Sequence, residues 1–237
     1  MRWEAAALLG LAAQASALGA SPARASEIPG AMIVLETAPG TPGSDPSAAP
    51  PRFVLLKDGQ VFVGGTARLE AGRLEKGEVS ALQKRADAVR KLPGISRAPV
   101  ALGGDAARTT RLWLRDGPLE VVATGDPAEA PPALAPVASL LSDLLAFHHP
   151  SLRPYSPAQY AMTVREVSRV GGCRAWAFAF PIAQAQAGPR SVTAAEASGW
   201  PTGALPASVC SDDAGPSTSA SRRYAVTLRP LLPGEQP

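Results

Sequence analysis

The sequence predicts an α+β protein: an antiparallel sheet built from two strand–strand–helix units and covered by two helices, followed by a smaller loop-rich β region. Two observations predict this fold. Residues 52–92 and 109–147 each contain two short apolar strands, an Asp-Gly turn between them and an amphipathic helix. From residue 150 onward, short alternating strand patterns are separated by segments rich in Pro, Gly and Ser.

Composition limits the classes of protein that fit. The chain has 237 residues, of which 46% are hydrophobic, and its formal net charge is +3. Gly (22) and Pro (25) together form about a fifth of the chain, which excludes a long coiled coil or an all-helical bundle. The basic residues are scattered rather than clustered, and this argues against a nucleic-acid-binding face.

The first unit begins at residue 52. Residues 53–57 and 60–64 are predicted strands, and Asp58-Gly59 is a strong hairpin turn signal because Gly adopts positive φ without steric cost. Residues 76–92 form a predicted helix whose other face is charged. Its apolar face carries Val79, Leu82, Ala86 and Val89.

The second unit repeats this plan. Residues 109–115 and 119–123 are predicted strands around Asp116-Gly117, which lies 58 positions after the first Asp-Gly pair, and residues 134–147 form the second helix. Two isolated hairpins would be marginal, whereas four strands and two helices can enclose one core. The repeat is consistent with a duplication, but any α+β domain can contain hairpins followed by helices. The apolar face of this helix carries Leu134, Val137, Leu141, Leu144 and Leu145.

The remaining residues suggest how the chain is divided. Residues 31–36 form a predicted short strand, and residues 37–51 contain five prolines, which is typical of a flexible loop or linker. The predicted organisation is therefore a signal peptide over 1–25, a strand and linker over 26–51, an α+β domain over 52–149, and a loop-rich β region over 150–237.

The loop-rich region has three predicted strands, at 160–170, 174–180 and 222–229. Residues 183–221 contain few bulky side chains, and residues 230–237 are expected to have no regular structure. The strand at 174–180 would place three aromatic side chains on one face: Trp176, Phe178 and Phe180.

The N-terminus resembles a secretory signal peptide. Arg2 precedes an apolar Ala- and Leu-rich run, and small residues allow cleavage after Ala17 or after Ala25. We therefore expect a secreted or periplasmic protein; the alternative is an Ala-rich helix of a cytosolic protein. No later apolar run reaches the length of about 18 residues that a membrane span requires, so the mature chain is predicted to have none.

Cys173 and Cys210 are the only cysteines, and they lie 37 positions apart outside any C-x-x-C motif. In an oxidising compartment they are predicted to form one structural disulfide, which would stabilise the fold by about 3–4 kcal/mol through loop closure. The alternative is two unrelated buried thiols. Metal binding would require more ligands nearby, and the chain contains only two histidines.

No motif points to a reaction. The chain has no phosphate-binding loop, G-x-S-x-G or H-E-x-x-H. His148 and His149 are adjacent, so their side chains diverge and are not expected to bind one metal ion. Asp58 and Asp116 are expected to be turn residues of hairpins, not a catalytic pair of carboxylates. Trp113 lies on a predicted strand and is expected to belong to the core or the sheet face, not to a ligand platform. We therefore predict no catalytic, cofactor-binding or metal-binding residues, and no cofactor.

Residues 53–147 resemble an uncharacterised domain family of exported bacterial proteins. The similarity consists of the D-G-x-V-x-x-G run at 58–64, a turn at Gly72, a helix ending at Leu92, and a second strand pair followed by a helix that begins after Pro132. The resemblance implies an architecture and an exported origin, but no activity.

These observations favour an exported, non-catalytic binding or structural module of the cell envelope, with an unknown protein or envelope partner. One alternative is an extracellular hydrolase whose active site has no recognisable motif. Another is a peptide binder that adds a strand to a partner through an exposed sheet edge.

Overall fold

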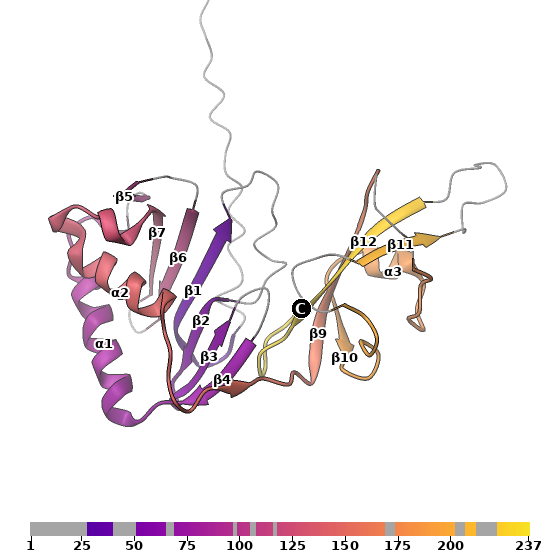
Figure 1. Ribbon diagram of the computed structural model, residues 1–237, viewed down its shortest axis with the longest axis horizontal. Coiled ribbons are helices and arrows are strands. Elements are labelled where there is room, and N and C mark those ends of the chain that lie inside the picture. Colours follow the sequence, from indigo (N-terminus) through magenta and orange to yellow (C-terminus); the bar gives the residue numbers. More distant parts are fainter. Residues whose placement is uncertain are drawn as a thin grey trace, which may run out of the picture.

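The computed structural model describes residues 28–39, 51–64, 69–96, 99–104, 108–115, 118–168, 174–201, 207–211 and 222–237. Over these ranges the chain forms two β-sheets and three α-helices, which confirms the predicted α+β class (Figure 1). Four predicted features lie outside the described residues: the signal peptide over 1–25, most of the linker over 37–51, the Asp116-Gly117 turn, and Cys173.

The first sheet has eight strands in the order β5-β7-β6-β1-β2-β3-β4-β8. All neighbours are antiparallel except β5 and β7, which are parallel. The strands are β1 (Ala31–Pro39), β2 (Phe53–Leu56), β3 (Gln60–Gly64), β4 (Leu69–Arg73), β5 (Val100–Gly103), β6 (Arg108–Leu114), β7 (Leu119–Gly125) and β8 (Arg153–Pro154).

Strand β1 lies at the centre of this sheet, between the two hairpins. It pairs with β2 on one side and with β6 on the other, so the sheet does not begin at residue 52 as predicted. The side chains of Ile33, Val34 and Leu35 are at most 2% exposed. A continuous apolar run is typical of a strand buried on both faces, whereas this run was predicted to lie in a segment outside the sheet.

Three further strands in the first sheet were not predicted: β4, β5 and β8. Strand β8 pairs with β4, so the sheet extends beyond the predicted boundary at residue 149. Gly72 was assigned to a turn, which was wrong, because it lies within β4 opposite Val61 of β3. A Cβ atom there would meet Ser151 Oγ at 2.5 Å, so Gly72 allows the chain after α2 to approach β4 closely. The Asp58-Gly59 turn is confirmed, with Gly59 at a φ of +83°.

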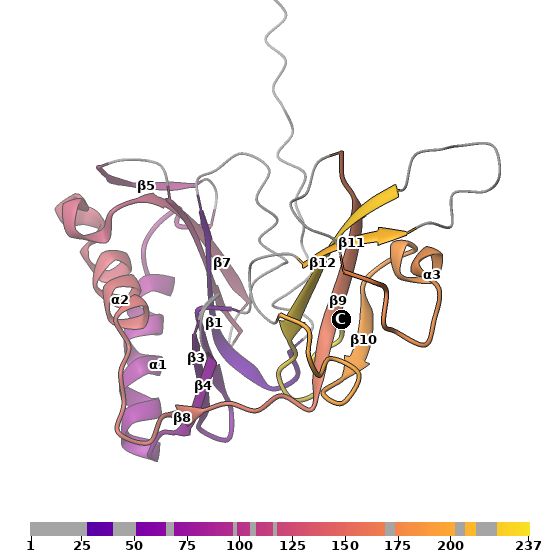
Figure 2. The same cartoon turned by 45° about the vertical axis from the view of Figure 1, so that its right-hand side comes forward.

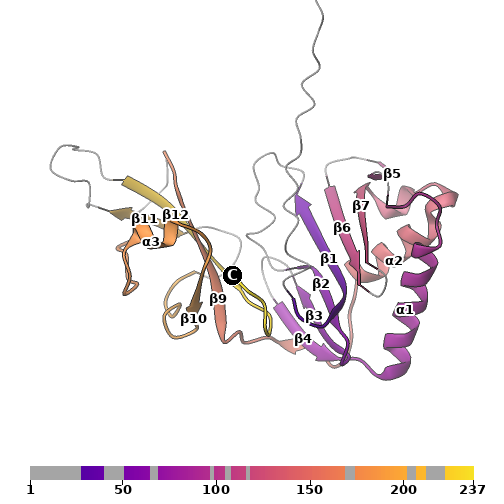
Figure 3. The ribbon, with the colours of Figure 1, turned by 180° about the vertical axis from the view of Figure 1, so that it is seen from behind.

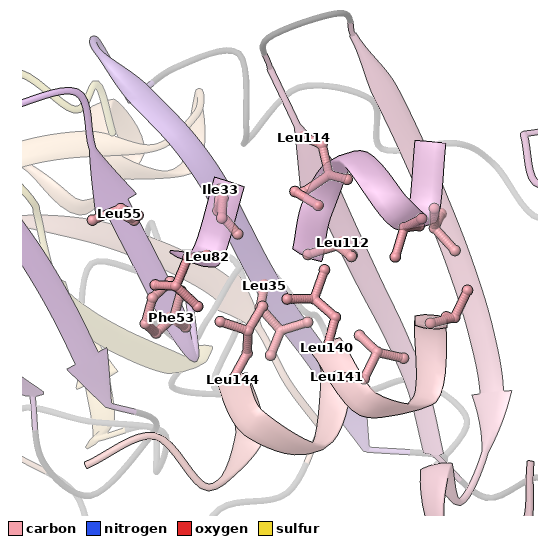
Figure 4. Packing of buried hydrophobic residues seen from close by; sticks show 14 of the residues in the cluster. Ile33, Leu35, Phe53, Leu55, Leu82, Leu112, Leu114, Leu140, Leu141 and Leu144 are labelled. Atoms are coloured by element: carbon pink, nitrogen blue, oxygen red, sulfur yellow. The ribbon is translucent and has the colours of Figure 1, made fainter. Parts of the chain in front are cut away.

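Helices α1 (Lys76–Arg90) and α2 (Ala135–Leu145) cover one face of the first sheet, as predicted (Figure 2). Two short 3-10 turns, Pro127–Glu129 and Pro132–Leu134, precede α2. Figure 4 shows side chains of both helices against the sheet. Most of the predicted apolar positions are buried, and Leu140 of α2 joins them. The interior of this layer includes Ile33, Leu35, Phe53, Leu55, Leu82, Leu112, Leu114, Leu140, Leu141 and Leu144.

The other face of the first sheet is covered by the residue before β1 that packs on it, Ile28, and by the segment around Leu232. Ile28 and Leu232 pack with the side chains of Val34, Val54 and Phe62. Phe62 also contacts the ring of Tyr155 edge to face, at a centroid distance of 5.3 Å. The segment after strand β12 (Arg222–Pro230) therefore lies between the two sheets (Figures 1 and 3).

The second sheet has four antiparallel strands in the order β10-β9-β12-β11. Strands β9 and β12 confirm two predicted strands, and residues 231–237 contain no helix or strand, as expected. The predicted strand at 174–180 is wrong: only Arg174 forms a bridge, to Val209 of β11. Its alternating small and aromatic residues belong to a loop that covers the sheet. The elements are β9 (Gln159–Glu166), α3 (Ile182–Gln186), β10 (Arg190–Thr193), β11 (Ala207–Ser211) and β12 (Arg222–Pro230).

Candidate functional site

Four aromatic side chains gather over one face of the second sheet: Trp176, Phe178, Phe180 and Trp200, here called the aromatic cluster. The Phe178 centroid lies 4.7 Å from that of Trp200, 5.0 Å from that of Trp176 and 5.6 Å from that of Phe180. The guanidinium carbon of Arg190 lies 4.0 Å from the centre of the Phe180 ring, in a cation–π contact. The four rings are therefore in contact as one cluster, with one cation stacked on Phe180.

Two loops hold the aromatic cluster in place. The backbone N–H of Arg174 donates to Ser208 O on β11 at 2.9 Å, and its guanidinium donates to Gly199 O at 2.9 Å, next to Trp200. Trp176 Nε1 donates to Phe180 O at 2.5 Å, which closes the first loop on itself. The side chains are thus supported by strand backbone and by cross-loop hydrogen bonds.

The aromatic cluster is only partly enclosed. Phe178 is buried, at 7% exposure, whereas Trp176, Phe180 and Trp200 are half-buried and present part of their rings to solvent. The whole chain has four Trp and five Phe, and four of these nine lie between residues 176 and 200. Half-exposed Trp and Phe on supported loops are the residue types that carry binding energy at recognition surfaces.

A second cluster ties the chain after α2 to the N-terminal turn of α1. His149 Nε2 lies 3.0 Å from Glu78 Oε1, and His149 Nδ1 lies 2.7 Å from Ser151 Oγ. Ser151 Oγ in turn accepts from Arg73 N at 3.1 Å and donates to Arg73 O at 3.0 Å. We call Glu78, His149 and Ser151 the histidine clasp.

The histidine clasp contains the side chains of a hydrolytic triad, but its geometry fits a structural role. Ser151 Oγ is engaged with both backbone groups of Arg73, so it takes the place of a strand partner at the edge of β4. A nucleophilic serine needs a hydroxyl that is directed to its base and open to a substrate. The His149 side chain is 20% exposed and that of Glu78 is 44% exposed, so the clasp lies at the surface.

Electrostatics in the histidine clasp favour ionised Glu78. Glu78 Oε2 accepts a hydrogen bond of 2.8 Å from the backbone N–H of Glu75, in a capping arrangement at the start of α1. This hydrogen bond is the main cause that lowers the pKa of Glu78, and the contact with His149 lowers the pKa further. Sequence reasoning missed the clasp because 71 positions separate its acid from its imidazole and no motif connects them.

A third polar group is buried between the sheets. Arg229 Nη1 and Glu235 Oε1 form an ion pair at 2.7 Å, with side-chain exposures of 3% and 0%. Glu235 Oε2 accepts from Leu232 N at 2.9 Å, and Tyr155 Oη donates to Leu231 O at 3.0 Å. Burial is the main cause that raises the pKa of Tyr155, and the Glu235 charge adds to it. This group fixes the segment after β12.

The predicted disulfide residues are only partly described. Cys210 lies on β11 opposite Arg223 of β12, and Cys173 lies outside the described residues, so their pairing stays a prediction. Trp113 lies on β6, half-buried at the margin of the face that Leu232 covers. His148 is exposed and has no part in the histidine clasp.

In the part of the chain that the structure describes, no group of three or more His, Cys, Asp or Glu side chains is placed to hold a metal ion. None of the described helices is long and apolar enough to cross a membrane. No protein-family model matches the chain, and neither a curated protein nor a solved structure was found to be similar to it.

Proposed function

We propose that this protein is an exported binding module of the cell envelope and that it contacts its partner through the aromatic cluster. The single observation that carries the proposal is the group of half-buried Trp176, Phe180 and Trp200 rings, held by two hydrogen-bonded loops on one face of the second sheet. Flat apolar rings of this kind stack on the planar or ring-shaped groups of polymers at little cost in conformational entropy.

Export is supported by the N-terminal pattern and by the position of Cys210. The Cys210 N–H donates to Arg174 O at 3.3 Å, and Arg174 directly follows Cys173 in sequence. A Cys173–Cys210 disulfide is therefore part of the proposal. It would fasten the loop that carries Trp176 to β11, and an oxidising compartment outside the cytoplasm would allow it to persist.

The proposal is tested with purified bacterial sacculi, whose glycan strands are the main ring-bearing polymer of the envelope. The full mature chain is expected to co-sediment with sacculi, and Trp200→Ala is expected to weaken this binding at least fivefold. Trp113→Ala is the matched control, since Trp113 is also half-buried but lies on the first sheet, and its binding should equal that of the parent.

Two results would contradict the proposal. One is the absence of co-sedimentation by the parent chain, and the other is equal binding by the parent and Trp200→Ala while thermal unfolding shows both folded. Export is checked separately by mass spectrometry of secreted material, where an intact N-terminus or two alkylatable thiols would contradict the exported, oxidised state.

A further inference from the structure

Two buried polar atoms lie in one cross-strand row of the second sheet. Ser191 of β10 is paired with Ala161 of β9, and Ala161 is paired with Arg229 of β12. Directly paired residues of antiparallel strands project from the same face, so the three side chains stand side by side with Ala161 in the middle. This is the face opposite the aromatic cluster, because the neighbouring positions Met162 and Val192 pack with that cluster.

Neither Ser191 Oγ nor Arg229 Nε has a hydrogen-bond partner among the described residues, although both atoms are buried. Arg229 is 3% exposed and Ala161 is 5% exposed, so bulk solvent does not reach the middle of the row. More than nine in ten buried polar groups in proteins are hydrogen-bonded, and leaving one without a partner is costly. The two atoms therefore indicate that a small molecule is bound in this row and hydrogen-bonded to them.

The charge and the size of the surrounding side chains limit which molecule can bind there. The Arg229 charge is already neutralised by Glu235, whose carboxylate lies 2.7 Å from Nη1, so an additional anion would be uncompensated in a buried place. Arg229 Nε requires an acceptor, and the Ser191 hydroxyl can both donate and accept. The Ala161 side chain between them is a single methyl group that is 5% exposed, so a molecule that reaches both atoms must be small.

We propose that water is bound over Ala161, hydrogen-bonded to Arg229 Nε on one side and to Ser191 Oγ on the other. Water satisfies both atoms, adds no charge and is the usual occupant of a small, polar, enclosed site. It connects the edge strand β10 to β12 across β9, and it completes the hydrogen bonding of the arginine that holds Glu235.

Ala161 allows a test with two side chains of equal shape. Val and Thr both fill the space over Ala161 and both displace the water, but only Thr supplies a hydroxyl in its place. We expect Ala161→Thr to have a higher urea midpoint than Ala161→Val, by at least 0.3 M. This order is the reverse of the usual one, because a hydroxyl at an ordinary apolar position lowers stability relative to a methyl group.

Ala123 provides the matched control. It lies on β7 of the first sheet, is 1% exposed and belongs to the apolar interior below the helices. There Ala123→Val is expected to be more stable than Ala123→Thr. If Val is equal to or more stable than Thr at position 161 as well, the proposed water does not exist.

A second variant links the effect to the proposed partner. Ser191→Ala is introduced into both Ala161→Thr and Ala161→Val. The difference in urea midpoint between these two variants is then expected to fall by about half, since one of the two hydrogen bonds of the Thr hydroxyl is lost. An unchanged difference would contradict the role of Ser191. Should the substituted chains fail to fold, the parent chain still decides: the Arg229 Nε–H proton should show a magnetisation-transfer cross-peak to a long-lived water in NMR spectra, and its absence overturns the proposal.

Discussion

Arg52 joins the first sheet to helix α2, which covers it, by two hydrogen bonds from one guanidinium group. Nη1 donates to Gly64 O on β3 at 2.6 Å, and Nη2 donates to Leu145 O at 2.8 Å, across 93 positions of sequence. Leu145 is the last residue of α2, so its carbonyl lacks a partner within the helix. A fixed cation at this end also complements the helix dipole.

Replacing Arg52 should therefore destabilise the first sheet and the helices that cover it. Arg52→Met keeps the aliphatic stem but leaves both carbonyls without their charged donor, and we expect the free energy of unfolding to fall by about 1.5–3 kcal/mol. The measurement is urea unfolding followed by far-UV circular dichroism. Arg115→Met, at another half-buried arginine directly after β6, is the comparison and should cost less. A loss below about 0.5 kcal/mol would show that Arg52 does not couple the layers.

The buried Arg229–Glu235 ion pair should be sensitive to the loss of one partner. Glu235→Gln leaves the Arg229 charge uncompensated at 3% exposure, and we expect a loss of about 3–5 kcal/mol in the free energy of unfolding. The double substitution Arg229→Met with Glu235→Leu removes both charges and should cost clearly less than Glu235→Gln alone. The opposite order would mean that the charge is reached by solvent.

The histidine clasp predicts a pH dependence of stability at its acidic group. The pKa of Glu78 is lowered in the folded protein by the Glu75 N–H and by His149. Its contribution to stability is therefore present above the unfolded-state pKa and is lost as the pH falls through the folded-state pKa. Glu78→Gln should flatten the acidic part of the stability profile measured by thermal melts from pH 3 to pH 7. Glu120→Gln, at an exposed position on β7, should leave the profile unchanged.

Two glycine substitutions of the same kind should have opposite effects. Gly72→Ala would place a Cβ 2.5 Å from Ser151 Oγ and 3.2 Å from the backbone N of Leu152. We expect a loss of about 1–3 kcal/mol, since backbone as well as side chain must move. Gly77→Ala in α1 meets nothing within 4 Å and should stabilise the protein by up to about 1 kcal/mol. Equal effects of the two variants would contradict the close approach of the segment after α2 to β4.

Local patterns sufficed for much of the first sheet and its two helices. The Asp58-Gly59 turn predicts its hairpin because the turn chemistry is complete within four residues, and both amphipathic helices follow from their apolar spacing. The central position of β1 did not follow, because the strand order depends on long-range pairing that one sequence does not encode locally. Strand β4 was missed because Leu69–Arg73 has no strong apolar alternation and contains Gly72.

The candidate site was predictable only in its parts. Trp176, Phe178 and Phe180 stood out as alternating aromatics, but the same spacing that suggested a strand occurs here in a loop, and Trp200 joins them from a separate turn. The Arg229–Glu235 pair and the histidine clasp depend on contacts that only the folded chain creates. The pairing of Cys173 with Cys210, and export itself, remain predictions.

The central place of β1 also constrains the order in which this protein acquires its shape during synthesis. Ile33 faces Leu114 of β6, so one edge of β1 stays unpaired until more than eighty further residues have emerged. Until then the growing chain exposes an apolar strand whose backbone N–H and C=O groups are unpaired along one edge. The open edge of β1 on the nascent chain can therefore pair with other chains, and this risk of aggregation ends only when β6 has been synthesised and pairs with β1.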